Sequence, residues 1–168
     1  MPAATNSFSP ERHIPVRNGQ SADAESIAQL INAAFVVERI AFDGDRIDTQ
    51  GVSALMNKGT FLLADGANGL SGCVYVEIVG QRSYLGLLSV APARQGTGLG
   101  RQLVAAAEEF SRNAACHTLD LRIISPRAEA LLPFYRHLGY TQTGTAPFPP
   151  DVKTKVPCHY ILMAKPLT

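Results

Sequence analysis

The chain has 168 residues, of which 46% are hydrophobic, and a formal net charge of +1 at pH 7. This length and composition predict one domain with a sizeable apolar core. The lysines and arginines are scattered singly along the chain, which argues against a dedicated nucleic-acid binder, because such proteins need clustered cations.

The three cysteines are Cys73, Cys116 and Cys158, which lie far apart and form no CxxC pair. This spacing gives neither a disulfide framework nor a zinc site, and it indicates a reducing compartment. The N-terminal residues lack the pattern of a secretory signal, and no apolar run approaches the roughly 18 residues that a membrane helix requires. We therefore expect a soluble cytoplasmic protein without a metal.

The first part of the chain predicts a tail, a strand and a helix. Residues 1–12 are polar and aperiodic, so we expect a flexible tail there and a single domain over residues 13–168. Residues 13–18 alternate apolar and polar side chains, as in a short edge strand. Residues 21–35 repeat apolar side chains at the spacing of an amphipathic helix.

The middle of the chain predicts a second helix and three strands. A polar connection leads to a short helix over residues 49–58, with Gly59 as its stop. Residues 61–65 and 70–79 predict a hairpin around the turn GANG. Residues 84–91 are almost continuously apolar, which is typical of a strand buried on both faces.

The remaining segments predict a helix, a strand, a second helix and two final strands. They cover residues 99–110, 117–124, 125–139, 140–144 and 158–165. In the last helix we expect Ser125 as N-cap, Pro126 at the first helical position and Gly139 as the stop. The order of elements indicates one α/β domain with a mixed sheet.

A glycine-rich turn lies between the apolar strand and the helix that follows it. Gly96, Gly98 and Gly100 alternate with other residues. Unpaired N–H groups at a helix start attract phosphate, and glycine lets a phosphate approach the backbone. The spacing fits neither GxGxxG, because Arg101 stands where the third glycine belongs, nor a nucleoside-triphosphate loop.

This stretch resembles the GNAT superfamily of acyl-CoA-dependent N-acetyltransferases. Their signature, Q/R-x-x-G-x-G/A after a V-x-P step, matches Val90, Pro92, Gln95, Gly98 and Gly100. The downstream segment PFYRHLGY is similar to a second family motif, and the element order agrees over residues 13–165. The resemblance implies a single-domain fold with a mostly antiparallel central sheet of about seven strands and about four flanking helices.

The resemblance implies acetyl-CoA as co-substrate and no metal. The backbone of Leu88, Ser89 and Val90 would pair with the pantetheine arm, and the Val90 N–H would polarise the thioester carbonyl. The residues implied to hold the pyrophosphate through their backbone amides are Gln95, Gly96, Thr97, Gly98, Leu99, Gly100 and Arg101.

Tyr135 matches the family tyrosine that protonates the departing CoA thiolate as a general acid. Its alternative role is that of a core aromatic residue. Many members carry an Asn seven positions earlier, where this chain has Ala128, so that contact is missing unless Ser125 or Arg127 supplies it. The implied reaction is direct attack by an amine, for which no cysteine nucleophile is needed.

The group that accepts the amine proton has several candidates. Some relatives use a Glu on the central strand, but residues 84–90 contain no carboxylate. Glu77 on the preceding strand and a chain of water molecules are equal alternatives, and Glu77 is also explained as a solvated strand residue. His159 titrates near neutral pH, although a structural histidine explains it equally well.

The acceptor site of this fold lies between the first two helices and the loop that joins the last strands. The corresponding residues are Phe35, Glu38, Phe42, Asp43, Asp45, Phe148, Asp151 and His159. Carboxylates beside phenylalanines would suit a cationic amine with an apolar part, and loop solvation explains the same charges.

We expect a small-molecule amine as acceptor. The alternatives are a protein lysine or N-terminus, and a non-catalytic acyl-CoA sensor. A homodimer is compatible with the resemblance, but no segment identifies an interface.

Overall fold

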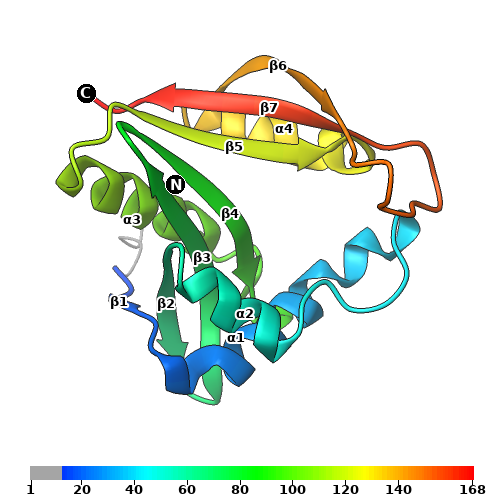
Figure 1. Ribbon diagram of the computed structural model, residues 1–168. Coiled ribbons are helices and arrows are strands. Elements are labelled where there is room, and N and C mark those ends of the chain that lie inside the picture. Colours follow the sequence, from blue (N-terminus) through cyan, green and yellow to red (C-terminus); the bar gives the residue numbers. More distant parts are fainter. Residues whose placement is uncertain (1–12) are drawn as a thin grey trace, which may run out of the picture.

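The computed structural model describes residues 13–168, which form a seven-stranded sheet with helices on both faces (Figure 1). The strands are β1 Val16–Asn18, β2 Thr60–Gly66, β3 Gly69–Val79, β4 Arg82–Val90, β5 Thr118–Ile124, β6 Thr141–Pro147 and β7 His159–Pro166. The α-helices are α1 Ala24–Ala34, α2 Thr49–Met56, α3 Leu99–Asn113 and α4 Ala128–His137. Short 3-10 turns are η1 Ser21–Asp23, η2 Phe35–Ile40, η3 Pro92–Arg94 and η4 Ser125–Arg127. The tail expected at residues 1–12 lies outside the described residues.

The sheet has the strand order β1-β2-β3-β4-β5-β7-β6. Every neighbouring pair is antiparallel except β4 and β5, which are parallel. This confirms the predicted single α/β domain with a mixed, mostly antiparallel sheet of seven strands and four α-helices in the described range.

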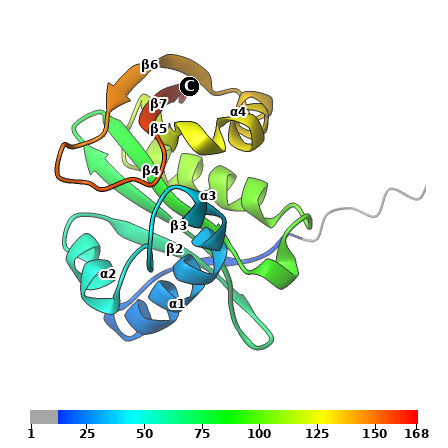
Figure 2. The ribbon, with the colours of Figure 1, turned by 90° about the vertical axis from the view of Figure 1, so that its right-hand side faces the viewer.

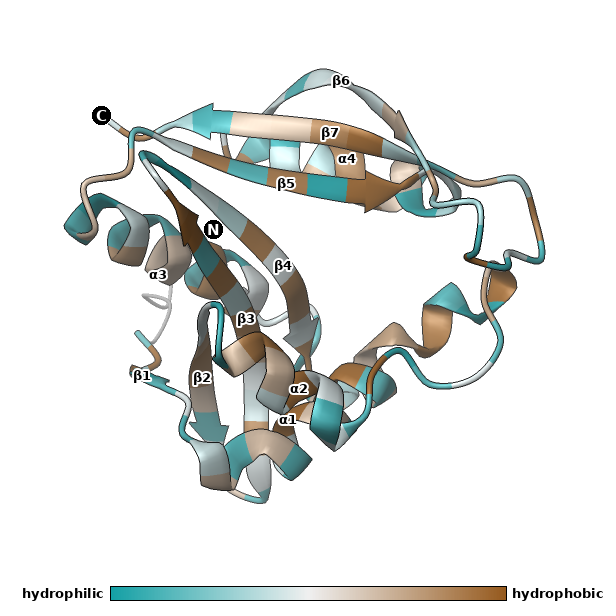
Figure 3. Ribbon diagram, in the orientation of Figure 1, coloured by the Kyte–Doolittle hydropathy of each residue, from teal (hydrophilic) through white to brown (hydrophobic). Residues whose placement is uncertain are grey.

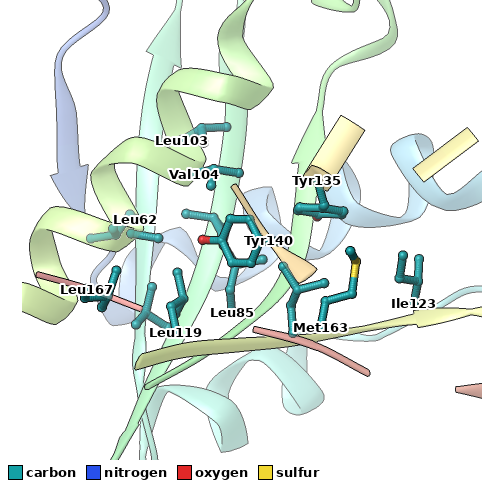
Figure 4. Packing of buried hydrophobic residues seen from close by; sticks show 14 of the residues in the cluster. Leu62, Leu85, Leu103, Val104, Leu119, Ile123, Tyr135, Tyr140, Met163 and Leu167 are labelled. Atoms are coloured by element: carbon teal, nitrogen blue, oxygen red, sulfur yellow. The ribbon is translucent and has the colours of Figure 1, made fainter. Parts of the chain in front are cut away.

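Alternation along the strands builds two separate apolar clusters. On β2, Phe61 and Leu63 pack toward α1 and α2, whereas Leu62 and Ala64 belong to the cluster around α3 and α4. The helices accordingly cover opposite faces of the sheet (Figure 2). Figure 4 shows part of the second cluster, whose labelled members are Leu62, Leu85, Leu103, Val104, Leu119, Ile123, Tyr135, Tyr140, Met163 and Leu167.

A buried charged group holds this second cluster together. Glu108 of α3 is 7% exposed, and its Oε1 accepts hydrogen bonds from Lys165 Nζ of β7 at 2.8 Å and from the Tyr140 hydroxyl at 3.1 Å. A buried carboxylate is costly unless it is paired. The three residues therefore join α3 to β7 and to the segment that follows α4.

The parallel strands β4 and β5 separate after a short contact. They pair only at Arg82 with Thr118, Ser83 with Leu119, and Tyr84 with Asp120. Beyond this contact the two strands diverge (Figure 1). β4 also carries an irregularity against β3, where Leu87 has a positive φ of 51°. Residues 86–88 are consequently half-buried, so the predicted burial of this strand on both faces is wrong there.

The structure changes three details of the predicted elements. Ser125 is not the N-cap of α4, because the chain first forms η4, and Ser125 Oγ instead accepts a hydrogen bond from His159 N at 3.1 Å. Part of the expected connection after α1 forms η2, and β6 extends to Pro147. Gly139 follows the end of α4 with φ of 95°, which confirms the predicted stop.

Candidate active site

A cavity of about 430 Å³ lies where β4 and β5 separate. One wall comes from residues 84–88 of β4, and the opposite wall from residues 121–124 of β5. Arg127, Leu131 and Tyr135 line it from the side of η4 and α4. Segments from η2 and from the loop between β6 and β7 complete the lining. The cavity thus exists because the sheet opens.

The edge of β4 that faces this opening has no strand partner among the described residues beyond Tyr84. Backbone N–H and C=O groups along such an edge require hydrogen-bond partners. Leu88 lines the cavity, whereas the Ser89 side chain is buried, with its Oγ donating to the Leu87 carbonyl at 2.9 Å. Val90 is half-buried and leads into the glycine turn. An extended chain with amide groups fits this edge.

The glycine turn places the start of α3 directly after β4. Gly96 and Gly98 have φ of 76° and 85°, in the left-handed region that favours glycine. Gly98 is the N-cap, and the Gln102 N–H donates to its carbonyl at 3.2 Å. The amides of Leu99 and Gly100 therefore have no acceptor within the helix. The positive end of a helix dipole also lies there, which suits an anion.

The side chains of the turn stabilise the turn itself. Thr97 Oγ1 donates to the Arg94 carbonyl at 2.5 Å, and Gln95 Nε2 donates to the Val90 carbonyl at 3.4 Å. Residues 92–97 and Arg101 are exposed. The residues predicted from 95 to 101 are thus contiguous at the helix start, where residues 95–97 and Arg101 are exposed, Gly98 and Gly100 are half-buried and Leu99 is buried.

Gly100 has a different status from the two glycines before it. Its φ is not positive, and a Cβ built there meets nothing closer than Phe134 Cζ at 3.7 Å and Val90 Cγ2 at 3.8 Å. The fold alone does not require glycine at this position. The free space above its backbone is the kind of close approach that a bound phosphate needs.

Tyr135 lies on α4 and is 6% exposed, with its ring in edge contacts with Phe134 and Tyr140. It lines the cavity, and its hydroxyl forms no hydrogen bond with any described residue. Burial raises the pKa of Tyr135, and nearby Tyr84 raises it further. The phenol therefore keeps its proton at neutral pH.

Glu77 and two of the expected acceptor residues are not among the residues that line this cavity. Glu77 lies opposite Tyr84 on β3, and its carboxylate accepts a hydrogen bond from the Tyr75 hydroxyl at 3.2 Å. Asp151 and His159 are exposed and also stand outside the lining. The expected acceptor residues that the structure does bring to the cavity are Phe35, Glu38, Phe42, Asp43, Asp45 and Phe148.

The Glu38 carboxylate has no ionic or hydrogen-bonding partner among the described residues, and the residue is half-buried in the cavity wall. Burial raises the pKa of Glu38, and the positive charges of Arg46 and Arg127 oppose this rise. The two aspartates of the same wall are paired. Asp45 lies 3.7 Å from Arg39, and Asp43 lies 3.4 Å from Lys155.

Four arginines line the cavity, and the sequence analysis did not predict that they lie together. Arg39, Arg46, Arg122 and Arg127 come from η2, the loop after it, β5 and η4. They outnumber the three carboxylates of the lining, so the expected carboxylates share the cavity with a larger number of cations. Because Arg39 and Arg46 lie far along the chain from Arg122 and Arg127, only the tertiary fold brings the two pairs together.

Aromatic rings follow one another along the acceptor side of the cavity. Phe42 lies 5.7 Å from Phe148, and Phe148 stacks on Tyr160 with ring centroids 4.2 Å apart. The Arg122 guanidinium continues this row, 4.3 Å from the Tyr160 ring and 5.7 Å from the Tyr84 ring. We call these five residues the aromatic wall.

The loop between β6 and β7 reaches across the opening to the segment after α1 (Figure 1). The Lys155 N–H donates to the Ala41 carbonyl at 2.8 Å, and Lys155 Nζ donates to the Arg39 carbonyl at 3.0 Å. With the ion pair to Asp43, these contacts form what we call the Lys155 bridge. Figure 3 shows hydrophobic residues on the neighbouring η2, where Val36, Val37 and Ile40 are exposed.

The described residues contain no group of three or more His, Cys, Asp or Glu side chains that could hold a metal ion. Cys73 and Cys116 are buried and Cys158 is half-buried, all as free thiols. Burial raises the pKa of Cys73 to about 12, so this thiol is not a nucleophile at neutral pH. Within residues 13–168, no helix has the length and apolar character needed to cross a membrane.

The glycine turn and the start of α3 follow directly on β4, and Tyr135 lines the cavity where β4 and β5 separate. The family model described as acetyltransferase (GNAT) domain matches residues 57–142, and the chain belongs to this family. It is therefore an acyltransferase of the acyl-CoA N-acyltransferase type.

Solved structures of acetyltransferases share this fold. Nourseothricin acetyltransferase is 23% identical, with a TM-score of 0.72 over 93% of this chain and 99% of that one. YncA of Salmonella typhimurium, described as a candidate acetyltransferase with its cofactor acetyl-CoA, is 21% identical, with a TM-score of 0.71 over 93% and 95%. The ribosomal-protein-S18-alanine N-acetyltransferase of Escherichia coli is 16% identical, with a TM-score of 0.71 over 92% and 94%. No curated protein matches the chain in sequence.

Proposed function

We propose that this chain transfers the acetyl group of acetyl-CoA to the primary amine of a small molecule. The observation that carries the proposal is the cavity at the separation of β4 and β5, because Tyr135 and the aromatic wall both line it. A volume of about 430 Å³ falls in the range of small-molecule sites.

In this proposal acetyl-CoA lies along the unpaired edge of β4. The backbone of Leu88, Ser89 and Val90 binds the pantetheine arm, and the Val90 N–H polarises the thioester carbonyl. The pyrophosphate binds the backbone amides of the turn from Gln95 to Arg101, including Gly96, Thr97, Gly98, Leu99 and Gly100. The helix start after Gly98 and the open space at Gly100 support this assignment.

The transfer needs one group that gives a proton and one that takes a proton. Tyr135 donates its proton to the CoA thiolate as the bond from sulfur to the acetyl carbon breaks. Glu38 receives the proton that the amine loses, directly or through water. Glu38 is favoured over Glu77 because it lines the cavity without a partner, whereas Glu77 is bonded to Tyr75.

The Lys155 bridge favours a small acceptor over a protein. Its residues Arg39 and Asp43 line the cavity beside Phe42 and Phe148, so the bridge crosses the side on which the acceptor would enter. A folded protein would have to displace these contacts to bring a terminus or a lysine to Tyr135, whereas a small amine would not.

The proposal is tested by calorimetry with acetyl-CoA, followed by a thiol-release assay over a panel of small amines and peptides. Turnover on small amines supports the proposal. Turnover on peptides alone would replace it with a protein acetyltransferase, and binding without turnover on any acceptor would indicate an acyl-CoA sensor.

A further inference from the structure

Arg122 has no role in the chemistry proposed above, although it belongs to the aromatic wall of the cavity. It lies on β5, and its neighbours Leu121 and Ile123 point into the core on the other face of the sheet. Its guanidinium carbon is 4.3 Å from the Tyr160 ring centroid and 5.7 Å from that of Tyr84. Two rings thus hold the guanidinium in place.

The charge of Arg122 is not neutralised by the described residues, because no carboxylate among them lies within 4 Å of it. The other lining arginines differ in this respect. Arg39 is paired with Asp45, and Arg46 and Arg127 act on Glu38. A guanidinium that stacks through its faces keeps its N–H donors at the edge, where they can bind an anion.

We infer that the acceptor is an amine that also carries a carboxylate, and that Arg122 binds this carboxylate. The inference rests on the proposed function. A planar guanidinium matches a carboxylate through two parallel hydrogen bonds. Glu38 supplies the opposite charge in the same cavity for an ammonium group. The site therefore has one fixed cation and one unpaired carboxylate, as a zwitterionic amino acid requires.

The aromatic wall extends this inference to the rest of the acceptor. Phe148 stacks on Tyr160 directly beside Arg122, and Phe42 follows. An acceptor whose carboxylate lies on Arg122 would place its side chain against these rings. Offset stacking and apolar burial would favour an aromatic or large aliphatic side chain there. The substrate class is thus an apolar amino acid or a close analogue.

The first test compares each amino acid with the amine that lacks only its carboxylate. The pairs are phenylalanine with phenethylamine, tyrosine with tyramine, and leucine with isoamylamine. In the unmodified protein we expect kcat/KM to be at least about tenfold higher for the acids, as for a lost hydrogen bond to a charged group. Arg122→Met should remove this preference, and Arg122→Lys should retain part of it.

A matched control is Arg136→Met, which removes an exposed arginine of α4 outside the cavity lining and should leave the preference intact. The second readout is binding alone. 3-Phenylpropionate and 3-phenylpropanamide are titrated onto the CoA-saturated protein, and Arg122→Met should selectively weaken the carboxylate.

The outcomes separate the inference from the proposed function. Acetylation of amines with no preference for the acids in any pair would overturn the inference and leave the function standing. Equal binding of 3-phenylpropionate to the unmodified protein and to Arg122→Met would overturn it as well. Carboxylate binding that depends on Arg122, with no transfer to any amine, would support the inference and overturn the function.

Discussion

Tyr135 and Glu38 line one cavity, and the proposed reaction has opposite requirements for their protons. Burial raises the pKa of both side chains. For the tyrosine this keeps the proton in place until a thiolate develops. For the carboxylate it makes the charged form a stronger proton acceptor, while Arg46 and Arg127 limit the rise.

Removal of the Tyr135 hydroxyl tests the proton donor. Tyr135→Phe should lower kcat by about 10²–10⁴-fold, because general acid catalysis contributes that much. The affinity for acetyl-CoA should be unchanged, since the ring contacts with Phe134 and Tyr140 remain. Thiol release and calorimetry measure the two quantities, and an unaltered kcat would assign Tyr135 to packing alone.

Replacement of Glu38 tests the proposed proton acceptor through the pH dependence of kcat/KM. Glu38 acts only when deprotonated, so kcat/KM should fall as the pH drops through its raised pKa. Arg46 and Arg127 act on its charge, and the other charged residues of the cavity lining are Arg39, Arg122, Asp43 and Asp45. Glu38→Gln should lose this acidic limb and most of the rate, and Glu77→Gln should keep both. The reverse pattern would assign the role of proton acceptor to Glu77.

The same substitution predicts a change in stability with a defined sign. Because folding raises the pKa of Glu38, the folded state holds this proton more tightly than the unfolded chain does. Its contribution to stability is full below the unfolded pKa and is lost as the pH rises through the folded pKa. The free energy of unfolding of Glu38→Gln minus that of the unmodified protein should therefore be larger at pH 7 than at pH 4. Urea unfolding at both values checks this.

The two glycines at the start of α3 have different physical reasons, one in the fold and one in the proposed ligand. Gly98 must adopt a positive φ, whereas Gly100 lies in the first turn of the helix with space for a Cβ. A glycine within a helix costs about 0.5–1 kcal/mol relative to alanine. Such a residue makes sense where a phosphate approaches the backbone.

Gly100→Ala should accordingly stabilise the free protein by up to about 0.5–1 kcal/mol and still weaken acetyl-CoA binding. The measurements are urea unfolding without ligand and calorimetry with acetyl-CoA. Gly98→Ala is the comparison, since it should lower stability as well as affinity. Unchanged affinity of Gly100→Ala would mean that the diphosphate does not lie over this residue.

Substitutions in the buried group of Glu108, Lys165 and Tyr140 test how α3 is held to β7. Lys165→Met leaves the carboxylate with only the Tyr140 hydroxyl, and it should lower the free energy of unfolding by about 1.5–3 kcal/mol. Glu108→Gln combined with Lys165→Met should lose less than the sum of the single changes, because the two residues interact. Additive losses would show that the pair contributes nothing jointly.

The sequence was sufficient for the elements because local periodicity and glycine stops determine them. Alternation along residues 70–79 and helical spacing after Gly98 both correspond to elements of the structure. The separation of β4 and β5 is not visible in the sequence, because it depends on pairing between distant strands. For the same reason Arg122 gave no signal, since its partners Tyr84 and Tyr160 come from two other strands.

At the scale of the whole molecule, the sheet consists of two parts that meet at few places. β1 to β4 form one part and β5 to β7 the other, joined by three pairs of β4 and β5, by the packing of α3 and α4, and by the Lys155 bridge. A ligand between β4 and β5 would contact both parts. The bridge is the connection on the acceptor side, far along the chain from the glycine turn.

Loss of the side-chain contacts of the bridge should therefore affect the acceptor and not acetyl-CoA. Lys155→Met removes the bond to the Arg39 carbonyl and the exposed ion pair to Asp43, which together stabilise the fold by no more than about 1 kcal/mol. The KM for a small amine should rise by up to about tenfold, as for one lost hydrogen bond. Lys153→Met removes an exposed lysine of the same loop and serves as the control.

Activity on peptides gives this substitution a second readout. If the bridge excludes large acceptors, Lys155→Met should acetylate peptides better than the unmodified protein does, while acetyl-CoA affinity stays the same. A KM that does not change for amines, with no gain on peptides, would mean that the bridge plays no part in acceptor selection. The preference for small molecules would then have to come from the walls of the cavity, where Arg122 and the rings beside it stand.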